Sequence, residues 1–124
     1  MTDTAPLTDE QLADISAREA AARPGPWYRE DDKQDLNRWV TNEAGTVEIN
    51  LGYLGNNNQA DAEFVAHARE DMPALLAEVR RLRAVEAAAR AFADEMGDYC
   101  SPHGIAADYA QRLRDRLQQA EGAA

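Results

Sequence analysis

The stretch RWVTNEAGTVEINL, residues 38–51, decides the fold that the sequence predicts. Its two ends, residues 38–42 and 46–51, are rich in the β-branched and aromatic side chains that are typical of strands. Between them lies Glu43-Ala44-Gly45, and a three-residue connection of this kind places glycine where the backbone must be left-handed. The stretch therefore predicts an antiparallel hairpin.

The register of this hairpin follows from pairing Asn42 with Thr46, and side chains alternate between the two faces of a strand. The predicted inner side carries Trp39, Thr41, Val47 and Ile49. The predicted water-facing side carries Arg38, Val40, Glu48 and Asn50. A further strand at Trp27–Glu30 completes a three-stranded meander, with the acidic residues 31–35 as an exposed loop.

A helix is expected before this sheet. Thr8 and Gln11 fit a capping box, and Leu7 stands where it can pack on the first turn. Apolar residues up to Ala22 supply one face of this helix. It ends at Pro24-Gly25-Pro26, because proline lacks the helical donor.

Three helices are expected after the sheet. Asn57 or Asn58 caps the first of them. Pro73 begins the second, because proline suits the first turn of a helix, and Gly97 ends it. Ser101-Pro102 starts the last helix, which folds back on its predecessor.

The predicted fold class is therefore α+β, with an N-terminal helix, a small three-stranded antiparallel sheet and then three helices, one of them long and heptad-patterned. A chain of 124 residues has room for one modest core, so residues 1–124 are expected to form a single domain. Residues 7–72 supply a helix, the meander and a second helix. Residues 73–118 supply the long helix and the C-terminal helix as an oligomerisation part.

The long helix carries the pattern that suggests self-association. Its apolar residues follow each other at alternating spacings of four and three, with Glu86 as the one polar step, and Val85 and Phe92 widen the stripe. A chain with so little sheet cannot cover this stripe alone, so a homodimer or a higher oligomer is expected. The expected interface consists of Leu75, Val79, Leu82, Val85, Ala89, Phe92 and Met96.

Charge and hydropathy exclude several classes of protein. The chain has 23 acidic and 13 basic residues, a net charge of -10, and duplex binding relies on neutralising phosphates, so no duplex nucleic-acid partner is expected. A mean hydropathy of -0.63 and the lack of a long apolar run argue against a membrane protein. The first ten residues do not resemble an export signal, which favours a cytoplasmic location.

No pattern points to catalysis, a metal or a cofactor. Glu63, His67 and Glu70 have helical spacings of four and three but lie opposite the apolar face of their helix, where polar residues are normally solvated. Cys100 and His103 have the spacing of half a zinc site, but a closed site needs four ligands. The two serines, Ser16 and Ser101, lack the strand-to-helix setting of a nucleophile.

One constellation suggests a small-molecule site. Aromatic faces stack on planar ligands, and amide side chains hydrogen-bond their edges. The candidate ligand-binding residues are Trp27, Arg38, Trp39, Asn56, Asn57 and Asn58. The alternative is that both tryptophans anchor the core and the asparagines cap a helix.

The opening helix, the Pro-Gly-Pro-Trp turn at residues 24–27, the segment NQADAEFVAHAR at 58–69 and PALLAEVRRLR at 73–83 together resemble the small Ead-like accessory proteins of phages and prophages, especially those of actinobacterial phages. The resemblance covers Leu7 to Arg83. Members commonly have a threonine before the turn, where this chain has Arg23. The resemblance implies a phage or prophage origin and an accessory role, and it implies no catalytic residues.

The function expected from the sequence is thus that of a non-catalytic phage or prophage accessory protein that binds a host protein. The alternative is a protein that binds or sequesters a small molecule of the nucleotide type. Binding of a ligand would stabilise the fold, which separates the two hypotheses in a thermal-shift screen.

Overall fold

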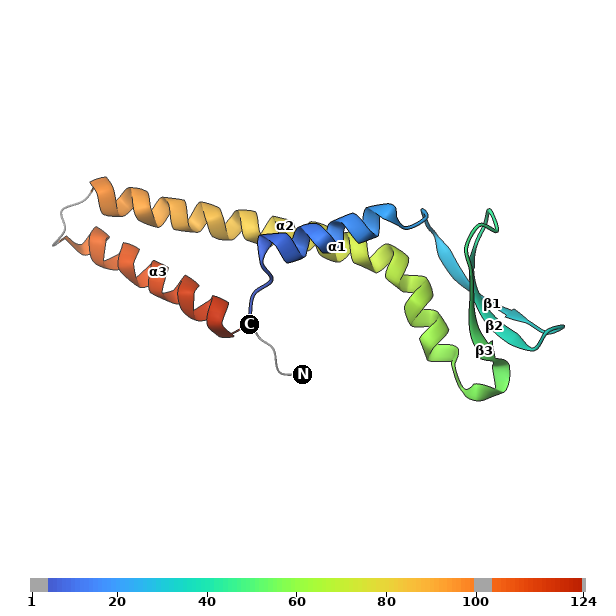
Figure 1. Ribbon diagram of the computed structural model, residues 1–124. Helices are drawn as coiled ribbons and strands as arrows, with labels where there is room; N and C mark the ends of the chain where they lie inside the picture. Colours follow the sequence, from blue (N-terminus) through green and yellow to red (C-terminus); the bar gives the residue numbers. More distant parts are fainter. Residues whose placement is uncertain (1–4, 100–103, 124) are drawn as a thin grey trace. The chain divides into compact units, whose positions relative to one another are not determined.

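The computed structural model describes residues 5–99 and 104–123, and it has an α+β fold (Figure 1). A three-stranded antiparallel sheet and three helices, one of them long, confirm the predicted class. The elements are α1 (Asp9–Ala21), β1 (Trp27–Asp32), β2 (Asn37–Asn42), β3 (Glu48–Tyr53), the 3₁₀ turn η1 (Leu54–Asn56), α2 (Gln59–Tyr99) and α3 (Ile105–Ala123).

The chain divides into two compact units, each described by itself. The sheet unit comprises Ala13–Ala77, and the helical unit comprises Met1–Leu12 with Glu78–Ala124. The expectations placed on Cys100, Ser101-Pro102 and His103 lie outside the described residues.

The start of α1 agrees with its sequence signature. The backbone N–H of Thr8 donates to Oε1 of Gln11 at 2.8 Å, and the N–H of Gln11 donates to Oγ1 of Thr8 at 3.0 Å. These two hydrogen bonds form the reciprocal capping box, which satisfies donors that a helix start leaves open. The helix then ends at Ala21, before Pro24, as predicted.

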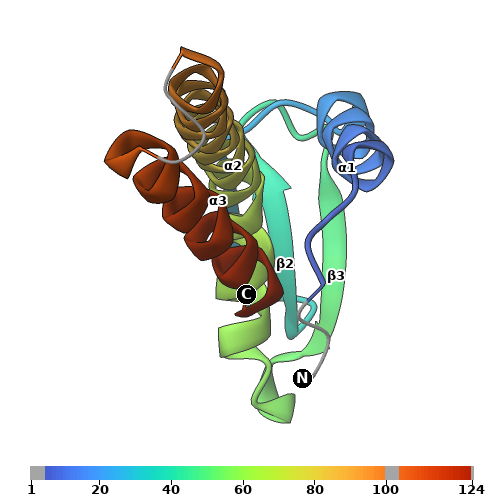
Figure 2. The same ribbon diagram turned by 90° about the vertical axis from the view of Figure 1, so that its left-hand side faces the viewer.

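The sheet is the predicted meander, in the order β1-β2-β3, but the predicted hairpin register was wrong by one residue. Figure 2 shows β2 and β3 side by side, and the pairs are Val40 with Ile49 and Thr41 with Glu48. Oδ1 of Asn42 accepts the backbone N–H groups of Thr46 at 2.9 Å and Val47 at 3.1 Å. These bonds hold Thr46 and Val47 in the turn, so β3 begins only at Glu48.

This shift moves β2 side chains to the opposite faces of the sheet, as a slip of one residue must. Arg38, Val40 and Asn42 are buried beneath α2, whereas Trp39 and Thr41 are on the other side. The prediction that Trp39 and Thr41 point inward, with Arg38 and Val40 toward water, was therefore wrong. Ile49 does pack against the core, as expected.

The core of the sheet unit lies between the sheet and the first turns of α2. Val40 is 0% exposed and packs with Ala62 and Ala66, and these small side chains let α2 approach the sheet closely. Trp27, Ile49, Leu51 and Val65 pack around this centre. We call the side of the sheet toward α2 the inner face. The inner face consists of Trp27, Arg29, Asp31, Arg38, Val40, Asn42, Ile49 and Leu51.

The helix α2 is one element where the sequence predicted two. Its 41 residues continue through Pro73, and the expected break there was wrong, as was the expected end at Gly97. Proline removes one helical hydrogen bond at a cost of about 3 kcal/mol. The flanking alanine, leucine, glutamate and arginine residues are strong helix formers, which favours continuation on both sides.

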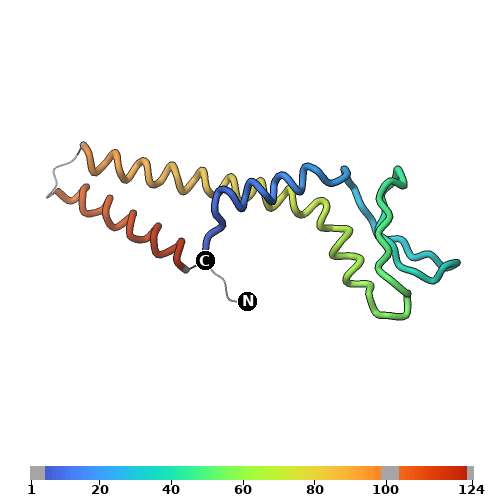
Figure 3. The backbone as a smooth tube through the Cα atoms, in the orientation of Figure 1, coloured from blue at the N-terminus to red at the C-terminus, as the bar shows by residue number. Residues whose placement is uncertain are grey.

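In the helical unit, α3 runs beside the C-terminal part of α2 in the opposite direction (Figure 3), which confirms that the last helix folds back. Ala93 and Ala110 are buried. Arg90 bonds Glu121 at 2.8 Å, and Arg114 bonds Asp94 at 2.9 Å and the carbonyl of Ala93 at 3.0 Å. Within the described part of the chain, no helix combines the length and the apolar character needed to span a membrane.

Candidate protein-binding surface

The inner face of the sheet holds Arg38, which the sequence assigned to a ligand. Nε of Arg38 donates to Oδ1 of Asp31 at 3.0 Å, and Nη1 donates to Oδ1 of Asn58 at 2.9 Å. Nδ2 of Asn58 in turn donates to the carbonyl of Leu51 at 2.7 Å. Both side chains are buried, and a buried charge needs such partners. Arg38 and Asn58 therefore tie β2 and β3 to the start of α2.

Arg29 extends this network along the same face. Its Nη1 lies 3.1 Å from Oε1 of Glu63 on α2, and its Nε lies 3.6 Å from Oδ1 of Asp31. Glu63 also lies 3.5 Å from Nε2 of His67. Two arginines thus face two carboxylates, and the positive charges of this face are matched within the fold.

The six proposed ligand residues do not gather in one place. Trp27 is half-buried on the inner face, where the guanidinium carbon of Arg69 lies 6.0 Å from its ring centroid. Trp39 is on the opposite face, and Asn56 and Asn57 are exposed. With Arg38 and Asn58 engaged in the buried network, the set is spread over both sides of the sheet and an adjoining loop.

The side of the sheet away from α2 carries aromatic rings and carboxylates instead of the buried arginine network. We call it the outer face, and it consists of Tyr28, Glu30, Trp39, Thr41, Glu48, Asn50 and Tyr53. Tyr28 is 45% exposed and Tyr53 is 52% exposed, and Trp39 is half-exposed between them. In the described strands, every arginine side chain is on the inner face, so the outer face combines aromatic rings with carboxylates and no base.

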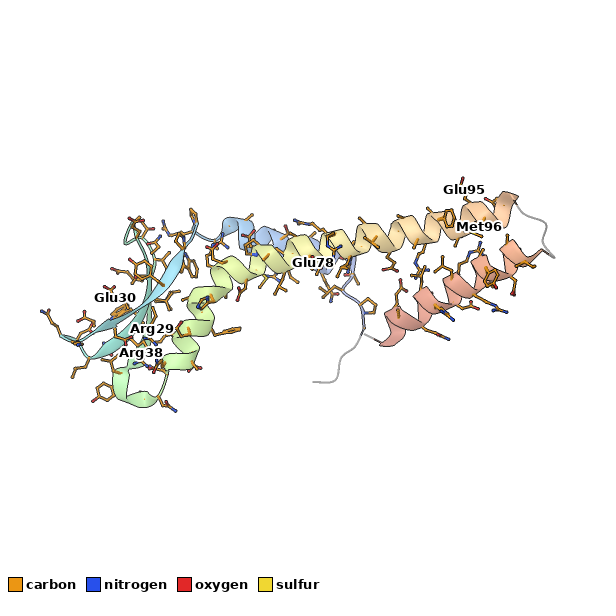
Figure 4. All side chains as sticks on the ribbon, turned by 180° about the vertical axis from the view of Figure 1, so that it is seen from behind. Arg29, Glu30, Arg38, Glu78, Glu95 and Met96 are labelled. Carbon is orange, nitrogen blue, oxygen red and sulfur yellow. The ribbon has the colours of Figure 1, made fainter. Side chains whose placement is uncertain are left out.

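Pairing across the strands sets six of these side chains in two rows, and Tyr53 lies beyond them, opposite Asn37. Trp39 is opposite Glu30 on one side and Asn50 on the other, while Thr41 is opposite Tyr28 and Glu48. Directly opposite side chains have Cβ atoms only about 4.5–5.5 Å apart. Figure 4 shows Glu30 on the side away from α2, and Arg29 and Arg38 toward it.

Trp39 is held in place by the loop between β1 and β2. Its Nε1 donates to Oδ2 of Asp35 at 3.1 Å, and Oδ1 of Asp35 accepts the backbone N–H of Asn37 at 2.9 Å. The indole orientation is therefore set before any partner arrives, and the entropic cost of ordering it on binding is reduced. Asp35 also adds a negative charge beside the outer face.

A second surface feature of the sheet unit is an apolar cleft of about 360 Å³ between α1 and α2. Ile15, Ala22, Ala68 and Met72 line it together with Trp27. Arg69 closes one side through hydrogen bonds to Oε1 of Glu19 at 3.0 Å and the carbonyl of Arg23 at 2.8 Å. Nε1 of Trp27 is buried and has no hydrogen-bond partner among the described residues.

The expected oligomer interface forms an apolar stripe on α2. Leu75, Leu82, Val85 and Phe92 are each more than half exposed, and Val79, Ala89 and Met96 are half-buried. In the helical unit, Leu82, Val85 and Ala89 also line a cleft of about 400 Å³ beside Leu117 of α3. The contacts of α3 therefore leave much of the stripe in water.

The described residues contain no group of three or more histidine, cysteine, aspartate or glutamate side chains placed to hold a metal. The carboxyl groups of Glu78 and Glu86 have a lowered pKa because of hydrogen bonds to neighbouring side chains. The hydrogen bond from Arg81 lowers the pKa of Glu78, and hydrogen bonds with Glu121 and then Arg90 lower the pKa of Glu86. Both are helix-surface contacts, which favour the ionised carboxylate.

Comparisons with protein-family models, with curated proteins and with solved structures found no match to this chain. The sequence had assigned Trp39 to a ligand site and to the core, and had missed Tyr28 and Tyr53 altogether. The signal for Tyr28 was the alternation along β1, which can be assigned to a face only when the register is known. Tyr53 does not follow the alternation of β3, because the pairing shifts between Asn37 and Trp39, and it is opposite Asn37.

Proposed function

We propose that the chain is a non-catalytic accessory protein of the phage or prophage type, and that it acts by binding a host protein through the outer face of its sheet. The observation that carries this proposal is the grouping of two exposed tyrosines and the partly exposed Trp39 with carboxylates on a face that α2 does not cover. The resemblance of residues 7–83 to Ead-like proteins is consistent with it. The place of action would be the cytoplasm of a bacterial host.

The composition of the outer face supports a protein partner. Tyrosine and tryptophan are enriched in the buried centres of protein interfaces, where they contribute large contact areas with few rotatable bonds. Glu30, which is opposite Trp39, and Asp35, which accepts its Nε1–H, are both acidic, and charges of one sign steer a complementary partner and reject others. The opposite face is already occupied, since α2 packs on it.

The proposal is tested by using the native chain to capture a binding protein from a lysate of the host, and then by measuring the Kd of each variant for that purified protein. Trp39→Ala removes the central ring of the outer face. Phe64→Ala is the matched control, because Phe64 is 76% exposed in the same unit but on α2. We expect one host protein to bind the native chain and the control with similar Kd, and to bind Trp39→Ala at least about tenfold more weakly. Equal loss in both variants, or retention in both, would contradict the proposal.

Self-association through the α2 stripe is part of this proposal. More than half of each of Leu82, Val85 and Phe92 is exposed, and apolar side chains in water favour association. A two-fold dimer is the simplest arrangement, because such an interface uses the same patch on both copies. Sedimentation equilibrium at about 100 μM tests it, and a monomer at that concentration contradicts it.

A second candidate function is the binding of a small planar molecule of the nucleotide type. The observation that favours it is the cleft beside Trp27, whose volume of about 360 Å³ falls in the range of ligand pockets. A thermal-shift screen against nucleotides tests it. A ligand at a hundred times its Kd raises the free energy of unfolding by about 2.7 kcal/mol.

A further inference from the structure

We infer that the outer face takes an arginine-rich, extended segment of its protein partner. This inference rests on the proposed function and adds the chemistry of the partner. Two independent properties of the outer face point to arginine, namely the sign of its charge and the placing of its aromatic rings. The spacing of its rows then indicates how the arginines are arranged.

Among the described residues, the glutamates of the outer face form no ion pair. Glu30 and Glu48 are exposed on it, and Asp35 borders it. The arginines of the sheet, Arg29 and Arg38, are on the inner face and are matched there by Asp31 and Glu63. A positively charged side chain that reaches the outer face therefore meets carboxylates without competition from the arginines of the described strands.

The aromatic rings select arginine over lysine. Trp39 is directly opposite Glu30, so a cation over the indole would be within reach of that carboxylate. A guanidinium is planar and can stack on the ring while its N–H groups point to the carboxylate. A lysine ammonium is a compact charge without a plane, and it would satisfy the carboxylate with less stacking.

The two rows of the outer face indicate the spacing. Trp39 and Thr41 are two residues apart on β2, which corresponds to about 6.7 Å along a strand. Glu30 is in the first row, and Tyr28 and Glu48 are in the second. Alternate side chains of an extended peptide are also about 6.7 Å apart. An arginine at every second position would therefore place one guanidinium on each row.

The test uses the full chain and a synthetic peptide of three arginines alternating with glycine, with the corresponding lysine peptide beside it. Glu30→Gln combined with Glu48→Gln removes two charges from the outer face while keeping side-chain size. Asp71→Asn combined with Glu95→Gln is the matched control, since it changes the net charge equally at exposed positions on α2, where Figure 4 labels Glu95.

Calorimetric titration at 50 mM salt gives the comparison. We expect the arginine peptide to bind the native chain and the control alike, and the Glu30→Gln, Glu48→Gln variant at least about tenfold more weakly. We expect the lysine peptide to bind the native chain several-fold more weakly than the arginine peptide. Binding should weaken at 300 mM salt, because exposed charges are then screened.

Several results would overturn the inference. If both double variants lose the same affinity, only net charge matters and the outer face is not the site. If the two peptides bind equally, the rings do not select arginine. Failure of this inference can be distinguished from failure of the proposed function. If a host protein binds the native chain but not Trp39→Ala, and that host protein has no arginine-rich segment, the proposed function stands and the inferred partner chemistry is refuted. Conversely, peptide binding at the outer face without any host partner refutes the function alone.

Discussion

The position of Val40 gives a sharp prediction for stability. Val40 is 0% exposed and packs against Ala62 and Ala66 beneath α2, so Val40→Ala removes two methyl groups from a close-packed site. The transfer of apolar groups into water costs about 0.8 kcal/mol for each carbon, or roughly 1.6 kcal/mol for two. A residual cavity of roughly 40 Å³ adds about 1 kcal/mol. We expect the free energy of unfolding to fall by about 2–3 kcal/mol.

Thr41, the neighbour of Val40 in the chain, supplies a control substitution whose expected effect on the free energy of unfolding has the opposite sign. Oγ1 of Thr41 is buried and has no hydrogen-bond partner among the described residues, although Thr41 is on the outer face. An unsatisfied polar group costs about 1–3 kcal/mol, so replacing it with the similarly shaped valine should not destabilise the fold. We expect Thr41→Val to leave the free energy of unfolding unchanged or to raise it by about 1 kcal/mol.

Urea unfolding followed by circular dichroism measures both changes. The dependence of the free energy of unfolding on urea concentration should be the same in the native chain and in both variants. The register expected from the sequence places Val40 toward water, where Val40→Ala would cost little. A nearly neutral Val40→Ala would therefore refute the observed register and the outer face that follows from it.

Further predictions concern the network, the tryptophans and the partners. Asn58→Ala should lower the free energy of unfolding by about 2–3 kcal/mol, because it leaves a buried hydrogen bond of Arg38 unmade; an effect below 0.5 kcal/mol in urea unfolding would contradict this. With Trp39 replaced by phenylalanine, the fluorescence of Trp27 should be blue-shifted and should resist quenching by iodide, since its Nε1 is buried; strong quenching would place Trp27 in water. Leu82→Ser combined with Phe92→Ser should convert a dimer into a folded monomer in sedimentation equilibrium, and an unchanged mass would exclude the stripe as the interface. A mobility-shift assay near 100 mM salt should show no binding of duplex DNA, since the net charge is -10; a retarded band would refute this expectation.

Local signals in the sequence were sufficient for α1 and for the presence of the three strands. The capping box of Thr8 and Gln11 fixed the start of α1, and turn residues such as Pro24 fixed its end. The strands were recognisable because β-branched and aromatic residues cluster in short runs bounded by turns. These features depend on neighbours within a few residues, which is why they could be predicted.

The errors arose where a side chain acts over a longer distance or against a local preference. Asn42 is the last residue of β2, as predicted, but it does not pair with Thr46 as a strand residue, because its side-chain amide organises the turn through the backbone N–H groups of Thr46 and Val47. Asn57 or Asn58 was expected to cap α2, and the carbonyl of Asn58 does accept the N–H of Ala62 at 3.1 Å, but its side chain bonds Arg38, which is 20 residues away in the chain. Pro73 indicated a boundary, but the helix-forming residues on both sides outweigh the loss of one hydrogen bond.

The two candidate sites also differ in how well the sequence predicted them. The stripe on α2 follows from spacing alone, because helical periodicity fixes which residues share a side. The outer face depends on strand register, and a slip of one residue exchanges Trp39 with Val40 between core and water. The acidic and aromatic composition of the outer face could therefore not be predicted from the sequence, because it depends on the pairing of Val40 with Ile49.

The indole N–H signals of the two tryptophans test the central claim most directly. Trp39 is on the outer face and Trp27 is on the inner face, so each signal reports on one side of the sheet. In a ¹⁵N–¹H correlation spectrum, titration with the captured host protein or with the arginine peptide should shift or broaden the Trp39 indole signal and leave the Trp27 signal in place. A response at Trp27 with none at Trp39 would contradict binding through the outer face.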